Sequence, residues 1–455
     1  MRRMASSFTK NKPVLPQELI DLILDKLALQ TPQEESIAAL QASSLVSRSF
    51  HSQSRRHLFS DIELVIDKSN LERASRLRRI LQRGWNDKEL VSVVRSLKLV
   101  LEVDARRAIY KARKTSVASA FLTKLGLNNN DQLKLVQLFA HSNLEALTVE
   151  AQARSFHIDP VLLQICSCRN LTSLRLVNIV NIPSSIITEA LSSCCLFNLE
   201  LCNILIIRDN QKAPDRPNQH RKQVLSRINR LEIRHVPYHS FFALLSSPLG
   251  GFKFPNLRIL EVSTPSCSEE VDALRDLVQA FSPSLETLEL ERGAPPGFFP
   301  TGFIFLNHLT SLRTLKFTAR CTTYRDFQSQ LGLLNSLLAS ATSPAGIHSI
   351  KIRFCVQLYS GTQWVPDTTW RMASGWTTLD NLLVGKTFVD LQRVSLTVET
   401  LYADSSLPKN RYVAGPNSKL DAEIVLPATS ASSSLSLSLE VYSVWFPRPM
   451  EYLYF

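Results

Sequence analysis

Glycine is scarce in this chain, with 13 glycines among 455 residues. Dinucleotide- and nucleoside-triphosphate-binding enzymes cradle phosphates in glycine-rich turns, and neither GxGxxG nor GxxxxGK[ST] occurs here. Long apolar runs are also missing, since no window approaches the ~18 apolar residues that cross a bilayer. The basic start meets no apolar stretch before Pro13, which argues against a secretory leader. We therefore expect a cytoplasmic or nuclear protein with no membrane partner and no cofactor.

Catalytic and zinc-binding motifs are absent as well. The eight cysteines do not form the two CxxC-like knuckles that structural zinc requires, so we expect buried thiols and no metal. There is no GxSxG and no HExxH. His235 and His239 are separated by Pro237, which keeps them off one helical face. The sequence predicts a protein that is not an enzyme.

The N-terminal segment has a clear helical pattern. Pro16 suits the start of a helix because its missing N–H would have no partner there, and Glu18 complements the helix dipole. Apolar residues then recur at helical spacing and form a stripe too wide to leave in water. These residues are Leu19, Ile20, Ile23, Leu24 and Leu27. A second helix reading ALxxSSLVSRSF, a third containing RRHLF, and an alternating strand over residues 61–66 follow.

The rest of the chain repeats the pattern L-x-x-L-x-L with aliphatic substitutes. From Leu144 to Leu312 the repeat starts differ by 27, 25, 32, 29, 28 and 27 residues, close to the ~20–29 residues of leucine-rich repeats. The repeats start at Val94, Leu144, Leu171, Leu196, Ile228, Leu257, Leu285, Leu312, Ile347 and Leu391. Alternation places the leucines on one face of a strand, and stacked strands bury that face in a parallel sheet.

Other features indicate an irregular solenoid. Segments 186–191 and 271–281 have helical apolar spacing and are expected to cover the sheet, and an asparagine follows the strand only at Asn178 and Asn203. Alternation over 435–441 predicts a final strand, and an insertion carrying Trp364, Trp370 and Trp376 is expected to pack on the repeats. The alternative is a set of separate α/β domains, which would need glycine-rich βα turns that are not apparent.

Taken in order, LPxELIxxIL, ALxxSSLVSRSF and RRHLF resemble an F-box of the kind expanded in fungi, here followed by leucine-rich repeats. The resemblance implies a three-helix module that binds the Skp-type adaptor of a cullin-RING ubiquitin ligase, with the repeats holding a target protein for ubiquitination. The adaptor-binding positions that it implies are Leu15, Pro16, Glu18, Leu19, Ile20, Ile23, Leu24, Leu27, Val46, Phe50 and Leu58. The alternative function is a repeat scaffold without a ligase role.

The expected fold is α/β with five segments: a disordered tail (1–12), the F-box (13–62), a basic helical linker (63–90), the repeat solenoid (91–400), and an irregular C-terminal strand and cap (401–455). Residues 71–124 hold 14 Lys or Arg against 5 Asp or Glu. We interpret this stretch as a solvated helical face. Nucleic acid is not an expected partner, because no aromatic interleaving or nucleic-acid module accompanies the charge.

One repeat position is expected to face outward from every strand. In the middle repeats this position is held by glutamate, and Arg230 and Arg234 flank one of these glutamates. We hypothesise an acidic stripe that binds a basic target segment; the alternative is ordinary glutamates on solvated strands. The stripe comprises Glu200, Glu232, Glu261, Glu289 and Glu291, bounded by the basic Lys316, Lys351 and Arg353.

Overall fold

A computed structural model describes residues 15–29, 33–66, 92–101, 139, 143–151, 170–180, 182–207, 224–245, 252–263, 265, 268–292, 304–342, 345–359, 373–403, 413–414 and 425–446. The chain divides into two compact units, with the division inside strand β3 (Ala146–Ala151). The predicted tail at 1–12, the linker beyond residue 66 and most of the basic stretch at 71–124 lie outside the described residues. Within the described residues, each helix is too short or too polar to span a bilayer.

The described residues of the first unit form three helices and two parallel strands. These are α1 (Gln17–Ala28), α2 (Gln33–Ser43), α3 (Arg48–Leu58), β1 (Asp61–Ile66) and β2 (Ser96–Leu101). Pro16 stands at the N-cap of α1, as its chemistry predicts. The predicted strand over 61–66 is confirmed, although it crosses the expected segment boundary at residue 62.

The predicted second helix was too long. It ends at Ser43, and α3 begins at Arg48 after Ser47, whose hydroxyl accepts a hydrogen bond from the Phe50 N–H. Serine side chains compete for backbone hydrogen bonds and favour helix ends over helix interiors, which explains the break. Val46 consequently lies in an exposed turn rather than on a helix.

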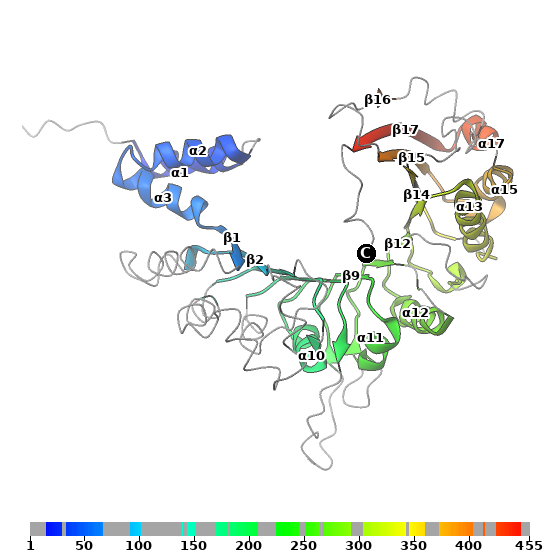
Figure 1. Ribbon diagram of the computed structural model, residues 1–455, viewed down its shortest axis with the longest axis horizontal. Coiled ribbons are helices and arrows are strands. Elements are labelled where there is room, and N and C mark those ends of the chain that lie inside the picture. Colours follow the sequence, from blue (N-terminus) through cyan, green and yellow to red (C-terminus); the bar gives the residue numbers. More distant parts are fainter. Residues whose placement is uncertain are drawn as a thin grey trace, which may run out of the picture. The chain divides into compact units, whose positions relative to one another are not determined.

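The second unit is a parallel sheet with helices on one side (Figure 1). The described strands follow the order β4-β6-β9-β11-β12-β13-β14-β15-β17-β16, and among them only the terminal β16–β17 pair is antiparallel. The strand bounds are β4 (Ser173–Val177), β6 (Asn198–Cys202), β9 (Arg230–Arg234), β11 (Ile259–Ser263), β12 (Thr287–Arg292), β13 (Thr314–Cys321), β14 (Ser349–Tyr359), β15 (Arg393–Ala403), β16 (Val413–Ala414) and β17 (Ser436–Phe446).

The helices of this unit line one side of the sheet in chain order (Figure 1). They are α10 (Ser184–Ser192), α11 (Tyr238–Leu245), α12 (Ser268–Phe281), α13 (Tyr324–Ala339), α15 (Gly375–Leu383) and α17 (Pro427–Ala431), with short turns η1 (Leu306–His308) and η3 (Lys386–Phe388). Two minor pairs join β5 (Ile182–Pro183) to β7 (Ile206–Ile207) and β8 (Val224–Leu225) to β10 (Phe252–Lys253). The helices predicted at 186–191 and 271–281 are confirmed.

Equivalent positions of successive repeats are paired on neighbouring strands. The strand leucines of successive repeats are paired and buried, as with Leu174 and Leu199 on β4 and β6. Three residues at the same place in their repeats, Asn178, Asn203 and His235, adopt the left-handed conformation directly after their strands. Asparagine and histidine are enriched in this region of backbone space. The Asn203 side chain donates to the Asn178 side chain at 2.8 Å, linking neighbouring turns.

The C-terminal strand is more regular than the sequence indicated. β17 pairs with β15 along its full 11 residues in parallel register. The expected boundary at residue 400 therefore falls inside β15, and the predicted final strand extends the same sheet. A cap was expected over 445–455; its first two residues, Trp445 and Phe446, belong to β17, and the rest lie outside the described residues.

Candidate functional site

An apolar patch is exposed along α1 and α2 and the residues that flank them. Of the fifteen large hydrophobic side chains exposed in the described residues, eight fall between residues 15 and 46. We call these eight the N-terminal apolar patch: Leu15, Leu19, Leu22, Ile23, Leu29, Ile37, Leu45 and Val46. The opposite face of α1 packs into a small core formed by Ile20, Leu24 and Leu40. Helix α1 is thus apolar on two sides, one covered and one in contact with solvent.

The structure divides the expected adaptor-binding residues into two groups. The exposed group is Leu15, Pro16, Glu18, Leu19, Ile23 and Val46. The internal group is Ile20, Leu24, Leu27, Phe50 and Leu58, which pack in the helical core. Ile20 and Leu24 are buried, which assigns them to internal packing, while adaptor contact by the exposed group stays a prediction. Sequence reasoning missed Leu22, whose spacing of three from Leu19 places it on the exposed face.

The outward-facing repeat positions form one row across the second unit. Strand pairing aligns each of these residues with the next one in the row. We call this the charged row: Arg175, Glu200, Glu232, Glu261, Glu289, Lys316 and Lys351. Four glutamates therefore stand side by side on strands about 4.8 Å apart.

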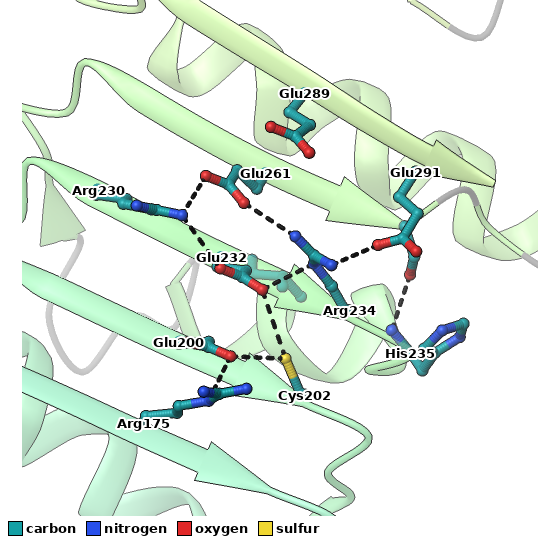
Figure 2. A network of polar contacts seen from close by, with 12 residues as sticks. Arg175, Glu200, Cys202, Arg230, Glu232, Arg234, His235, Glu261, Glu289 and Glu291 are labelled. Atoms are coloured by element: carbon teal, nitrogen blue, oxygen red, sulfur yellow. Dashed lines mark hydrogen bonds and ion pairs between the residues drawn. The ribbon is translucent and has the colours of Figure 1, made fainter. Parts of the chain in front are cut away.

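Arginines from the same sheet face pair with Glu200, Glu232 and Glu261 (Figure 2). Arg230 lies 2.6 Å from Glu261 and 3.6 Å from Glu232. Arg234 reaches three carboxylates, at 2.7 Å from Glu232, 3.0 Å from Glu261 and 2.6 Å from Glu291. A Glu232 oxygen lies 2.7 Å from the Arg234 Nε, but the Nε–H does not donate a hydrogen bond to it. The contact between these two groups is therefore an ion pair without a hydrogen bond.

Four further ion pairs extend this network to the neighbouring strands. They are Arg175–Glu200 at 2.7 Å, Lys316–Glu289 at 3.0 Å, Arg320–Glu291 at 3.0 Å and Arg353–Glu399 at 2.5 Å. We call the charged row together with Arg230, Arg234, Glu291, Arg320, Arg353 and Glu399 the charged face. The expected open acidic stripe is corrected by this geometry: its central carboxylates, Glu232 and Glu261, are buried and paired within the chain.

Burial has a measurable consequence for Glu232. Removal from water raises the pKa of this carboxyl to about 7, against the opposing charge of Arg234 and with help from Glu200 and Glu261. Since the ordinary value is 4.5, the folded state binds more protons than the unfolded state between these two pH values. The stabilising contribution of this group is complete below pH 4.5 and is lost as the pH rises to about 7.

We expect Glu232→Gln to remove that pH dependence, because glutamine mimics the protonated acid. Relative to the unmodified protein, the free energy of unfolding of the variant should rise between pH 5 and pH 8 by on the order of 1–3 kcal/mol. Urea unfolding at both pH values measures this difference. Glu289→Gln removes one carboxylate from the same row and is the control. Equal pH responses of the two variants would contradict the assignment to Glu232.

One cluster has residue types that bind metals, but its donor atoms are not available for a metal ion. Ligand atoms of Glu200, Cys202 and Glu232 lie within 4.8 Å of one another. Burial, followed by the charges of Glu200 and Glu232, raises the pKa of the Cys202 thiol far above its usual range, so the thiolate that binds metals is disfavoured. Both carboxylates already hold arginines. These donors therefore serve the ion-pair network.

Neither a protein-family model nor a curated protein matches this chain. What the protein binds is inferred from the N-terminal apolar patch and the charged face.

Proposed function

We propose that the protein is the substrate-recognition subunit of a cullin-RING (SCF-type) ubiquitin ligase. In this proposal helices α1–α3 are an F-box that docks on a Skp-type adaptor, and the second unit is an irregular leucine-rich-repeat solenoid that holds a target. The protein itself performs no chemistry. It places lysines of the target near the charged ubiquitin carrier, and such proximity accelerates a bimolecular reaction strongly.

The N-terminal apolar patch carries the proposal. Leu15, Leu19 and Ile23 follow one another at four-residue spacing and present 43–46% of their surface to solvent. Each buried Å² of apolar surface stabilises a complex by about 25 cal/mol before association costs. Contiguous apolar surface on a soluble protein marks an interaction site. Its place on LPxELIxxIL is where the F-box resemblance implies adaptor contact.

The repeat identity is supported by recurrence of local geometry. Starts about 27 residues apart give one parallel strand each, and the outward positions fall in one row. The left-handed turn after the strand recurs at Asn178, Asn203 and His235. Separate α/β domains would not align the same repeat position on consecutive strands.

The alternative, a repeat scaffold with no ligase role, makes the helices a hydrophobic cap. A cap covers its apolar stripe within the chain, whereas Leu19 and Ile23 remain exposed. This exposure favours adaptor docking.

The test is binding of a purified Skp-type adaptor to the full-length protein and to a Leu19→Glu, Ile23→Glu double variant. Both side chains are exposed, so the fold should tolerate the change. We expect the variant to lose at least about 100-fold in affinity, since buried anchors of an interface contribute about 2 kcal/mol or more each. Calorimetry or surface plasmon resonance provides the dissociation constants.

Leu225→Glu is the matched control, because Leu225 is equally apolar and 64% exposed but belongs to the second unit. This variant should bind the adaptor as the unmodified protein does. If the unmodified, folded protein fails to bind the adaptor, the ligase role is wrong. If both variants bind normally, the patch is not the docking site.

A further inference from the structure

The charged face presents its two signs unequally to solvent. The carboxylates of Glu200, Glu232, Glu261, Glu289, Glu291 and Glu399 are 5–24% exposed. The cations paired with them, Arg175, Arg230, Arg234, Lys316, Arg320 and Arg353, are 30–53% exposed. Six acids and six bases balance in sum, yet the bases form the outer layer. An approaching molecule therefore meets guanidinium and ammonium groups first.

Lys351 adds a cation that has no counter-ion among the described residues. It is exposed, lies directly beside Lys316 in the strand register, and makes no ion pair with any described residue. Like charges directly opposite each other on neighbouring strands are unfavourable. Lys316 is held by Glu289 on its other side, so the excess positive charge sits between β13 and β14.

We propose that the charged face binds an acidic segment of a target protein, with Lys316 and Lys351 as its principal contacts. This proposal rests on the target-holding role proposed above and names the chemistry of the target. It replaces the basic segment that was hypothesised from the sequence. Arginine has five hydrogen-bond donors in a planar fork and lysine has three, so each cation can also donate to a carboxylate of a bound peptide.

The dimensions of the face fit an extended peptide. From β9 to β14 there are four strand spacings, about 19 Å, which an extended segment of about six residues spans. Single-stranded nucleic acid fits less well, because it stacks its bases on aromatic side chains. Among the outward-facing residues of β9 to β14 from Arg230 to Cys355, the side chains are charged, small or aliphatic, with no aromatic ring among them.

The experiment uses the full-length protein and a fluorescein-labelled peptide of about six consecutive glutamates, with its lysine counterpart as a second probe. Lys351→Glu is compared with Lys386→Glu, which makes the same charge change at an exposed lysine on η3. Fluorescence anisotropy should show glutamate-peptide binding weakened about tenfold by Lys351→Glu and little changed by Lys386→Glu. The lysine peptide should bind more weakly than the glutamate peptide.

Equal loss in the two variants would mean that only the net positive charge attracts the probe, and the proposal would be overturned. Tighter binding of the lysine peptide, or of a single-stranded oligonucleotide that loses affinity with Lys351→Glu, would also overturn it. Adaptor binding, measured on the same preparations, keeps the two proposals apart. Retained adaptor binding with no acidic-peptide site rejects the target chemistry alone, and the reverse result rejects the ligase role alone.

Discussion

Replacing Arg234 by alanine is expected to lower the free energy of unfolding by about 3 kcal/mol, the scale on which breaking a buried ion pair destabilises a protein. Arg234 contacts Glu232, Glu261 and Glu291 on three strands, and the first two carboxylates are buried. Arg230 still reaches both of these after the change. It is one cation against two buried anions, so a net negative charge remains under the surface.

Arg175→Ala is the matched control. Arg175 forms one ion pair, with Glu200, and is 53% exposed. Exposed pairs contribute about 0–1 kcal/mol, so this variant should unfold nearly as the unmodified protein does. Urea unfolding followed by circular dichroism at pH 8 measures both. Similar losses for Arg234 and Arg175 would show that the burial of the network does not set its energy.

The same reasoning predicts a dependence on pH for the Arg234 variant. Loss of the guanidinium removes the charge that opposes the raised pKa of Glu232. More of this carboxyl is then protonated near neutrality, and the protonated form is cheaper to bury. The destabilisation by Arg234→Ala should therefore shrink as the pH falls from 8 to 5.

The register of the sheet was predictable because it depends on local alternation. Leucines two apart must share a face, and repeats of near-constant length align that face on successive strands. The row from Glu200 to Lys351 follows directly. Helical apolar spacing, which is equally local, predicted the helices at 186–191 and 271–281.

The charge pairing was less predictable, because it depends on contacts between strands. Alternation places Arg230, Glu232 and Arg234 on one face of β9, and their flanking relationship was visible in sequence. Arg234 also extends past Glu261 on the neighbouring strand to Glu291, two strands away, and this contact depends on the length of its side chain. The stripe therefore looked acidic in sequence, while in the fold the arginines cover it.

The N-terminal helices show a similar limit. Apolar spacing identifies α1 but not which of its two apolar sides is covered, because that depends on how α2 and α3 pack. Ile20 and Leu24 face the core, while Leu19 and Ile23, one residue earlier in each case, face solvent. A rotation of about 100° per residue separates these two sides.

A second large effect is expected at Trp376, where the tryptophan-rich insertion joins the sheet. Trp376 is buried, and its ring lies 5.8 Å from Phe327 on α13 and 5.9 Å from Phe354 on β14. The preceding Gly375 permits this approach, since an added Cβ would meet the Leu331 Cγ at 2.8 Å. The expectation that the insertion packs on the repeats is confirmed for Trp376, while Trp364 and Trp370 lie outside the described residues.

We expect Trp376→Ala to lower the free energy of unfolding by about 3–5 kcal/mol, because it leaves a large cavity between α13, α15 and β14. Trp376→Phe keeps an aromatic ring against Phe327 and Phe354 and should lose roughly 1–2 kcal/mol. Exposed Val389→Ala, near the same helix in sequence, should change stability little. Differential scanning calorimetry of the three variants gives this order. If Trp376→Ala were no less stable than Val389→Ala, the aromatic cluster would not anchor α15 to the sheet.

The same variants should also differ in acidic-peptide binding. Trp376 packs against β14, which carries Lys351. Loss of the indole should loosen this strand, so peptide binding should weaken in Trp376→Ala and be retained in Trp376→Phe.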